Sequence, residues 1–291
     1  MIELVSCILC SSLIFVVFKL FPRYKIDTFQ AIVFNYFTAA SCGIIFFHSE
    51  FKGITANDVD ILKYAFYCAI LFISLFLIMG ISSQRNGVGS TSVAVKMSMS
   101  ISMLAMIYYN HESLSILKIS GLIAAILGVI LVSLPSKSAS SGKQAIWMLF
   151  VLFFGSGLLD FLLEIIQKKC KLSGWHPGLF SAMGFLMAGI MGIGIIGIQL
   201  LRKKMKIELK NIFAGIVLGV PNYFSIYLLL AAYQTTGWSD STVLAIINVS
   251  VVLTASIIGL SLFSEKLNLK KTIGLCFSIL AIIILYISNA R

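Results

Sequence analysis

The stretch "HESLSILKISG" (111–121) places a polar corner between two apolar segments, and "SEKLNLKKTIG" (264–274) repeats it near the other end of the chain. Both stretches share the pattern E-x-L-x6-G. A second pair of stretches, "QRNGVGSTSV" (84–93) and "QTTGWSDSTV" (234–243), shares the pattern Q-x-x-G-x-x-x-[ST]-[ST]-V. Two patterns that recur in the same order and at nearly the same offset indicate an internal duplication of the chain.

Composition determines the class of protein. Of the 291 residues 59% are hydrophobic and 11% are charged, and the mean hydropathy is +1.01. A soluble domain carries about 25% charged residues. The charges here lie in short groups between long apolar runs, which is typical of a multi-pass helical membrane protein. We therefore expect an all-α integral protein of the cell membrane. Nucleic acid is not expected as a partner, because the net charge of +11 is spread over separate loops.

Ten apolar runs are each long enough to cross a bilayer, which takes about 20 residues as a helix. They are 2–21, 29–47, 61–81, 90–109, 115–134, 145–167, 178–201, 212–233, 241–263 and 270–288. Lipid offers no partner for unpaired backbone groups, so all ten are expected to be transmembrane helices.

The Ser/Lys/Gly-rich linker 136–144 separates five runs (1–135) from five (145–291). An odd number of spans in each half means that the second half enters the membrane upside down. The chain is therefore expected to form two inverted five-helix repeats, an arrangement common in secondary transporters. A duplication with only a structural role is the alternative.

The chain resembles the drug/metabolite transporter superfamily, EamA type. The resemblance lies in the length, the two five-span halves and the corners "HESL" and "SEKL" after the fourth span of each half, although both corners lack the preceding glycine that is frequent in that family. It implies a carrier coupled to protons or another gradient, frequently an exporter of amino acids or related metabolites. It also implies that both termini lie inside, whereas the surplus of basic residues on the face opposite the N-terminus predicts that they lie outside.

Lys96 and Asp160 are charged and lie well inside apolar runs, where ionisable side chains are costly and by default face a cavity. Lys96, in "VAVKMSMS", either snorkels to the near face or binds a carboxylate or phosphate, and Asn35 at a similar depth could share that work. Asp160, in "LLDFLLEIIQKK", is expected to bind a solute ammonium group or a coupling proton, with a structural hydrogen bond as the alternative. The two charges lie on the order of 10 Å apart along the membrane normal, which suits a zwitterionic solute.

The remaining candidates lie in the second half. Pro221 and Asn222 predict a kink or break near the middle of the eighth run, and broken helices at that depth often mark transporter sites. Tyr223 and Tyr227 share a helix face and could form aromatic walls, while Asn248 reaches roughly the depth of Asp160.

Other small and polar residues are expected to have structural roles. The glycines of the seventh run and the Gly215-x-x-x-Gly219 pair are expected to permit close helix packing; those of the seventh run are Gly184, Gly189, Gly192, Gly194 and Gly197. Glu112 and Glu265 are expected to cap the helix that follows each of them.

The expected function is secondary active transport of a small organic solute, an amino acid or related metabolite, by alternating access, and the resemblance implies export as its direction. The open alternatives are a multidrug or cationic xenobiotic exporter, an organic-phosphate or nucleotide-sugar exchanger, and a membrane scaffold or enzyme. No nucleophile–base pair, phosphate-binding loop or metal-ligand spacing occurs, so neither enzymatic activity nor a metal or other cofactor is expected. The expected partners are the solute, the bilayer and possible coupling protons, and the oligomeric state is open.

Overall fold

The computed structural model describes residues 2–47, 59–109, 116–133, 146–173, 177–203, 206–236, 240–265 and 268–289, which form helices and short connections without a strand. The elements are α1 (Ile2–Leu20), η1 (Phe21–Tyr24), α2 (Thr28–Phe47), α3 (Val59–Arg85), α4 (Val88–Met97), α5 (Met99–Tyr109), α6 (Ile116–Ser133), α7 (Ile146–Ser173), α8 (Pro177–Leu201), α9 (Leu209–Thr235), α10 (Asp240–Phe263) and α11 (Leu269–Asn289). Each predicted apolar run coincides with helix, and the fourth is divided into α4 and α5.

Several of these helices are long and apolar enough to cross a membrane. In the described part of the chain seven segments meet this criterion: Ile2–Tyr24, Thr28–Phe47, Leu62–Arg85, Ile146–Leu163, Gly178–Leu201, Leu209–Leu229 and Ile246–Phe263. Large hydrophobic side chains such as Ile193, Phe213 and Ile257 are exposed on the outside of the bundle, as expected where lipid replaces water. Together with the composition, these helices establish a multi-pass helical membrane protein.

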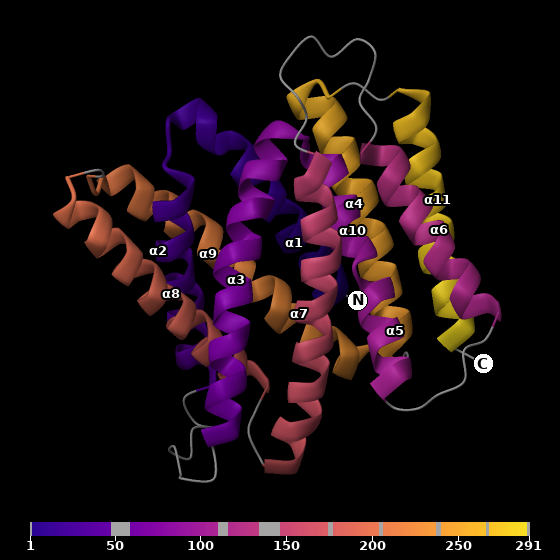
Figure 1. Cartoon of the computed structure of the whole chain (residues 1–291), viewed down its shortest axis with the longest axis horizontal. Coiled ribbons are helices and arrows are strands. Elements are labelled where there is room, and N and C mark those ends of the chain that lie inside the picture. The colour runs from indigo at the N-terminus through magenta and orange to yellow at the C-terminus, as the bar shows by residue number, and fades with distance from the viewer. Residues whose placement is uncertain are drawn as a thin grey trace.

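The helices on either side of the 136–144 segment are interleaved. In Figure 1, α2, α8 and α9 lie at one edge of the bundle and α6 and α11 at the other, with α1, α3, α4, α7 and α10 between them. α2 packs on α8 and α9, α1 on α9 and α10, α3 on α7 and α8, α4 on α7 and α10, and α6 on α11. Every one of these pairs joins a helix before residue 136 to one after residue 144.

Glycines set two of the closest helix contacts. A methyl group on Gly215 of α9 would lie 2.7 Å from the carbonyl oxygen of Ala31 in α2, and one on Gly219 would lie 2.7 Å from that of Asn35. A methyl group on Gly274 of α11 would lie 3.0 Å from the carbonyl oxygen of Gly128 in α6. Only residues without a side chain allow backbones to approach this closely.

The glycines of α8 are divided between packing and open positions. Gly184, Gly189 and Gly192 face side chains of neighbouring helices, as expected. Gly194 and Gly197 have nothing within 4 Å of a methyl group placed on them, so the packing prediction is wrong for these two.

Two helix starts are capped by side chains. Asp27 Oδ1 accepts a hydrogen bond from the Gln30 N–H (2.9 Å) at the start of α2, and Asn268 Oδ1 accepts one from the Lys271 N–H (2.8 Å) at the start of α11. Such caps satisfy backbone donors that lack a helical partner. The expectation that Glu265 caps the helix that follows it is therefore wrong, because Asn268 does so. Glu112 and the linker 136–144 lie outside the described residues.

Candidate functional site

The fourth apolar run is interrupted at Ser98. Its hydroxyl lies 2.6 Å from the carbonyl oxygen of Val95, and the Ser100 hydroxyl donates to the carbonyl of Met97. Serine hydroxyls that bond to preceding carbonyls compete with the helical N–H donors and bend helices. The Ile101 N–H donates to the Ser98 carbonyl (2.9 Å), a tighter 3₁₀-type bond at the same place.

The break was expected elsewhere. The sequence pointed to Pro221, but α9 continues through this proline from Leu209 to Thr235 without interruption. The interruption therefore lies in the fourth apolar run and not in the eighth.

Ser98 connects the break to Asp160. The Ser98 hydroxyl lies 3.1 Å from Asp160 Oδ2 as well as 2.6 Å from the Val95 carbonyl oxygen, so its single proton is shared between two acceptors. Lys96 precedes Ser98 by about 3 Å along the helix axis, and it interacts electrostatically with Asp160 and with Cys7 of α1. The two charges thus lie closer in depth than the spacing estimated from the sequence.

Asp160 lies on the interior side of α7. The exposed apolar residues Trp147, Val151, Phe154 and Leu158 form one stripe along this helix, which is the face expected to meet lipid. At about 100° per residue, Asp160 is turned about 200° from Leu158. Its side chain is nevertheless exposed. An exposed carboxylate on the side away from lipid indicates solvent access from within the bundle.

Asn248 of α10 lies next to the Ser98 break. Its Nδ2 lies 3.0 Å from the sulfur of Met99, the first residue of α5, and the residue is 4% exposed. Thioether sulfur is a weak acceptor, so the amide retains capacity for a stronger partner. We call Lys96, Ser98, Asp160 and Asn248 the Ser98 cluster; it draws on α4, α7 and α10.

Asn35 and Asn222 pair with each other between α2 and α9. Asn222 Nδ2 donates to Asn35 Oδ1 (3.2 Å) across the α2–α9 contact, and both residues are buried. Asn35 also donates to the carbonyl of Ile32 at 3.4 Å. The two amides therefore bond to each other at a helix–helix interface.

Tyr223 and Tyr227 share a face, as predicted. Their rings stack with centroids 6.2 Å apart, and Phe46 of α2 stacks on Tyr223 at 6.0 Å. Tyr223 is buried and its hydroxyl has no hydrogen-bond partner within the described residues. These rings form an aromatic wall between α2 and α9, on the same interface as Asn35 and Asn222.

Ser98 was missed as a functional candidate. Its signal in the sequence is the alternation of serines in "KMSMSIS" (96–102), where three hydroxyls closely follow a lysine inside an apolar run. The ion pair of Lys19 with Glu265, 3.6 Å between Nζ and Oε1, was also missed. Its partners are far apart in the sequence, so no local pattern could reveal it. No cluster of three or more His, Cys, Asp or Glu side chains suited to a metal occurs in the described ranges.

Comparison with known proteins gives the fold but no activity. No protein-family model matches the chain. An uncharacterized protein of Haemophilus influenzae is 29% identical over 290 residues, covering 98% of this chain and 97% of that protein. A crystal structure of a protein described no further has a TM-score of 0.60 at 8% identity, and the match covers 100% of this chain and 97% of the other. The chain therefore shares its whole-length fold with a solved structure.

Proposed function

We propose that this protein is a secondary transporter of the drug/metabolite transporter type, which exports a small solute carrying both an amino and an acidic group. The observation that carries the proposal is the Ser98 cluster. It places a lysine and a solvent-accessible carboxylate of opposite charge at a helix break in the apolar part of the fold. Ionisable groups in such places usually mark a solute or ion pathway.

The helix contacts support ten spans arranged as two inverted repeats. Exchanging the halves replaces α1, α2, α3, α4 and α6 by α7, α8, α9, α10 and α11. The contacts α1–α9, α1–α10 and α2–α9 then become α7–α3, α7–α4 and α8–α3, which also occur. In three further contacts the exchange only swaps the two partners, so each contact maps onto itself; these are α2–α8, α4–α10 and α6–α11. This is the pattern expected of a pseudo-two-fold axis.

The proposed chemistry follows from the charges. A solute carboxylate would bind the Lys96 ammonium, and a solute ammonium would bind Asp160, so that each charge gains a partner of opposite sign. Ser98 would orient the Asp160 carboxylate, and the Asn248 amide would exchange its weak sulfur acceptor for a solute oxygen. A proton bound to Asp160 in the absence of solute would couple transport to the proton gradient.

The test compares solute release from cells that express the protein at matched membrane levels. We expect Lys96→Gln and Asp160→Asn each to abolish release of an amino-acid-like metabolite that the wild type exports. Lys206→Gln and Glu208→Gln, which change exposed charges of a connecting segment, should retain it. If the wild type releases no metabolite beyond an empty-vector control, the proposed export is wrong.

The same variants separate the rival solutes. Loss of activity in Asp160→Asn alone, with Lys96→Gln unaffected, would indicate a cationic xenobiotic. Loss in Lys96→Gln alone would indicate an organic phosphate or another anion. Proton coupling is tested in liposomes, where an imposed pH gradient should drive accumulation of the solute by the wild type and an uncoupler should abolish it.

A further inference from the structure

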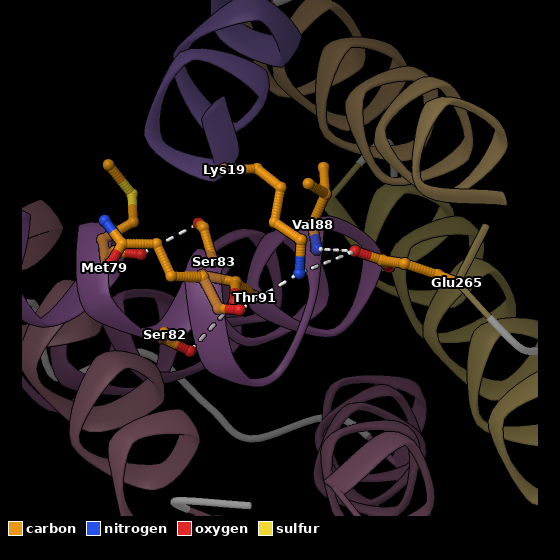
Figure 2. Close-up of polar contacts among 8 residues, drawn as sticks. Lys19, Met79, Ser82, Ser83, Val88, Thr91 and Glu265 are labelled. Carbon is orange, nitrogen blue, oxygen red and sulfur yellow. Dashed lines mark hydrogen bonds and ion pairs between the residues drawn. The ribbon is translucent and has the colours of Figure 1, made fainter. Parts of the chain in front are cut away.

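Glu265 joins the two halves at one end of the bundle. Its Oε1 accepts a hydrogen bond from the Val88 N–H at the start of α4 (2.7 Å) and lies 3.6 Å from Lys19 Nζ at the end of α1. Lys19 in turn donates to the carbonyl of Gln84 at 3.1 Å. Figure 2 shows Lys19, at the end of α1, and Glu265, just after the end of α10, reaching toward each other beside Val88. One carboxylate from the second half thus holds two segments of the first.

Two glycines make room for this carboxylate. Methyl groups on Gly87 and on Gly259 would each lie 2.6 Å from Glu265 Oε2. Gly87 also has a φ of +98°, a conformation that side chains rarely allow. The cradle therefore comes from both halves, and it fits a carboxylate in the position that the Lys19 and Val88 contacts require.

A buried seam lies between this end and the Ser98 cluster. Gly89 of α4 meets Ser256 of α10, and every residue from 86 to 94 is buried. Lys96 is only partly buried, and Asp160 is exposed. The cluster is therefore reached by solvent from somewhere other than the Glu265 end, which the seam closes.

The seam contains polar groups beside apolar ones such as Val132, Leu260 and Leu275. A cavity of about 20 Å³, enough for one water molecule, is lined by Ser90, Ser256, Glu265 and Lys271 among others. The Ser256 hydroxyl is buried without a hydrogen-bond partner in the described part of the chain. Opening such a seam would hydrate groups that gain from water, whereas opening an apolar seam would not.

We infer that the Lys19–Glu265–Val88 contact is a latch, which closes this end of the pathway and breaks when the halves separate there. The inference rests on the proposed transport function for its purpose, but the motion itself can be measured without any solute. Opening would transfer Lys19 and Glu265 to water together, so both charges stay solvated in the open state.

The experiment measures the separation of the halves at this end. Nitroxide labels are attached to cysteines at Arg85 and Lys270, which are exposed residues of opposite halves, in a full-length chain whose native cysteines are replaced. Distances are recorded by double electron–electron resonance in liposomes. We expect one dominant distance in the otherwise unaltered chain. Glu265→Gln and Lys19→Gln should each add a component that is longer by several ångströms, and the control Glu208→Gln should not.

A disulfide provides a second measurement. A Cβ on Gly89 would lie 3.5 Å from that of Ser256, within the range that a disulfide allows. A disulfide formed between Gly89→Cys and Ser256→Cys before the labels are attached should abolish the longer component in the Glu265→Gln background.

Two results would overturn the latch. One is an identical distance distribution in the wild type, Glu265→Gln and Lys19→Gln. The other is a longer component that appears only in protein that no longer elutes as a folded species on size exclusion. A longer component in both variants supports the latch even if no exported solute is found, so failure of the latch and failure of the transport function remain distinguishable.

Discussion

Glu265 and Gly87 belong to different repeated patterns in different halves of the chain, and they touch in the folded protein. A methyl group on Gly87 would lie 2.6 Å from Glu265 Oε2, while the next residue, Val88, donates its N–H to the same carboxylate. The E-x-L-x6-G pattern of the second half thus supports the Q-x-x-G pattern of the first. This contact between residues of the two patterns gives a physical reason for the occurrence of both in one chain.

Gly87→Ala should destabilise the protein. It combines an unfavourable φ of +98° with a clash against Glu265, and strain of this kind costs about 1–3 kcal/mol. The measurement is the apparent Tm in detergent. Gly194→Ala is the matched control, because nothing lies within 4 Å of its added methyl group. Equal Tm values for the two variants would contradict the account of the cradle.

Gly219→Ala should weaken the contact between α2 and α9. The added methyl group would lie 2.6 Å from Thr38 Cβ and 2.7 Å from the Asn35 carbonyl oxygen, and backbone atoms cannot rotate away. Overpacking typically costs about 1–3 kcal/mol, which should appear as a lower Tm. Gly197→Ala, in open space, should leave the Tm unchanged, and a similar loss there would show that packing is not the cause.

Asn35 and Asn222 should be coupled in stability. Their hydrogen bond of 3.2 Å is buried between helices, and such bonds in membrane proteins contribute about 0.6 kcal/mol on average, up to about 1.7. A double-mutant cycle of Asn35→Ala and Asn222→Ala measures this term. We expect a positive coupling and unchanged transport. Strict additivity together with lost transport would instead return these residues to the solute site.

Ser98→Ala should impair transport more than stability. The variant removes the donor to Asp160 Oδ2, and one neutral hydrogen bond contributes about 0.5–1.5 kcal/mol. Ser92→Ala is the control, because the Ser92 hydroxyl donates to the Gly89 carbonyl (2.8 Å) in the same way on the same helix, six residues before Ser98. We expect a higher apparent KM for Ser98→Ala only. A parallel rise in Ser92→Ala would mean that helix bending, and not Asp160, sets the affinity.

Hydropathy predicted the helices well because the length of an apolar run is a local property. Helix ends were less predictable: α3 continues to Arg85, past the expected end at 81, and α7 continues to Ser173, past 167. Helical hydrogen bonds do not stop where the apolar residues stop. The division of the fourth run was also invisible to hydropathy, because it depends on the hydroxyl bonds of Ser98 and Ser100.

The candidate site was predicted in part. Lys96 and Asp160 could be selected because a charge inside an apolar run is costly wherever it lies. Their approach through Ser98 and the pairing of Asn35 with Asn222 depend on contacts between helices distant in the sequence. A single sequence does not show how such helices are aligned against each other. The depth of a residue along its own helix was therefore the only available guide. That guide grouped Asn35 with Lys96 and could not predict the hydrogen bond that Asn222 donates to Asn35.

The packing of α1 on α9 and α10 has a consequence for biosynthesis. α1 leaves the ribosome long before its main partners α9 and α10, so it must wait in the bilayer while the helices between them are synthesised. Lipid solvates its apolar side chains about as well as another helix does, which makes the delay tolerable. Lipid tails cannot replace Glu265 as the partner of Lys19. Until Glu265 is translated, the Lys19 ammonium group must be solvated by headgroups or water.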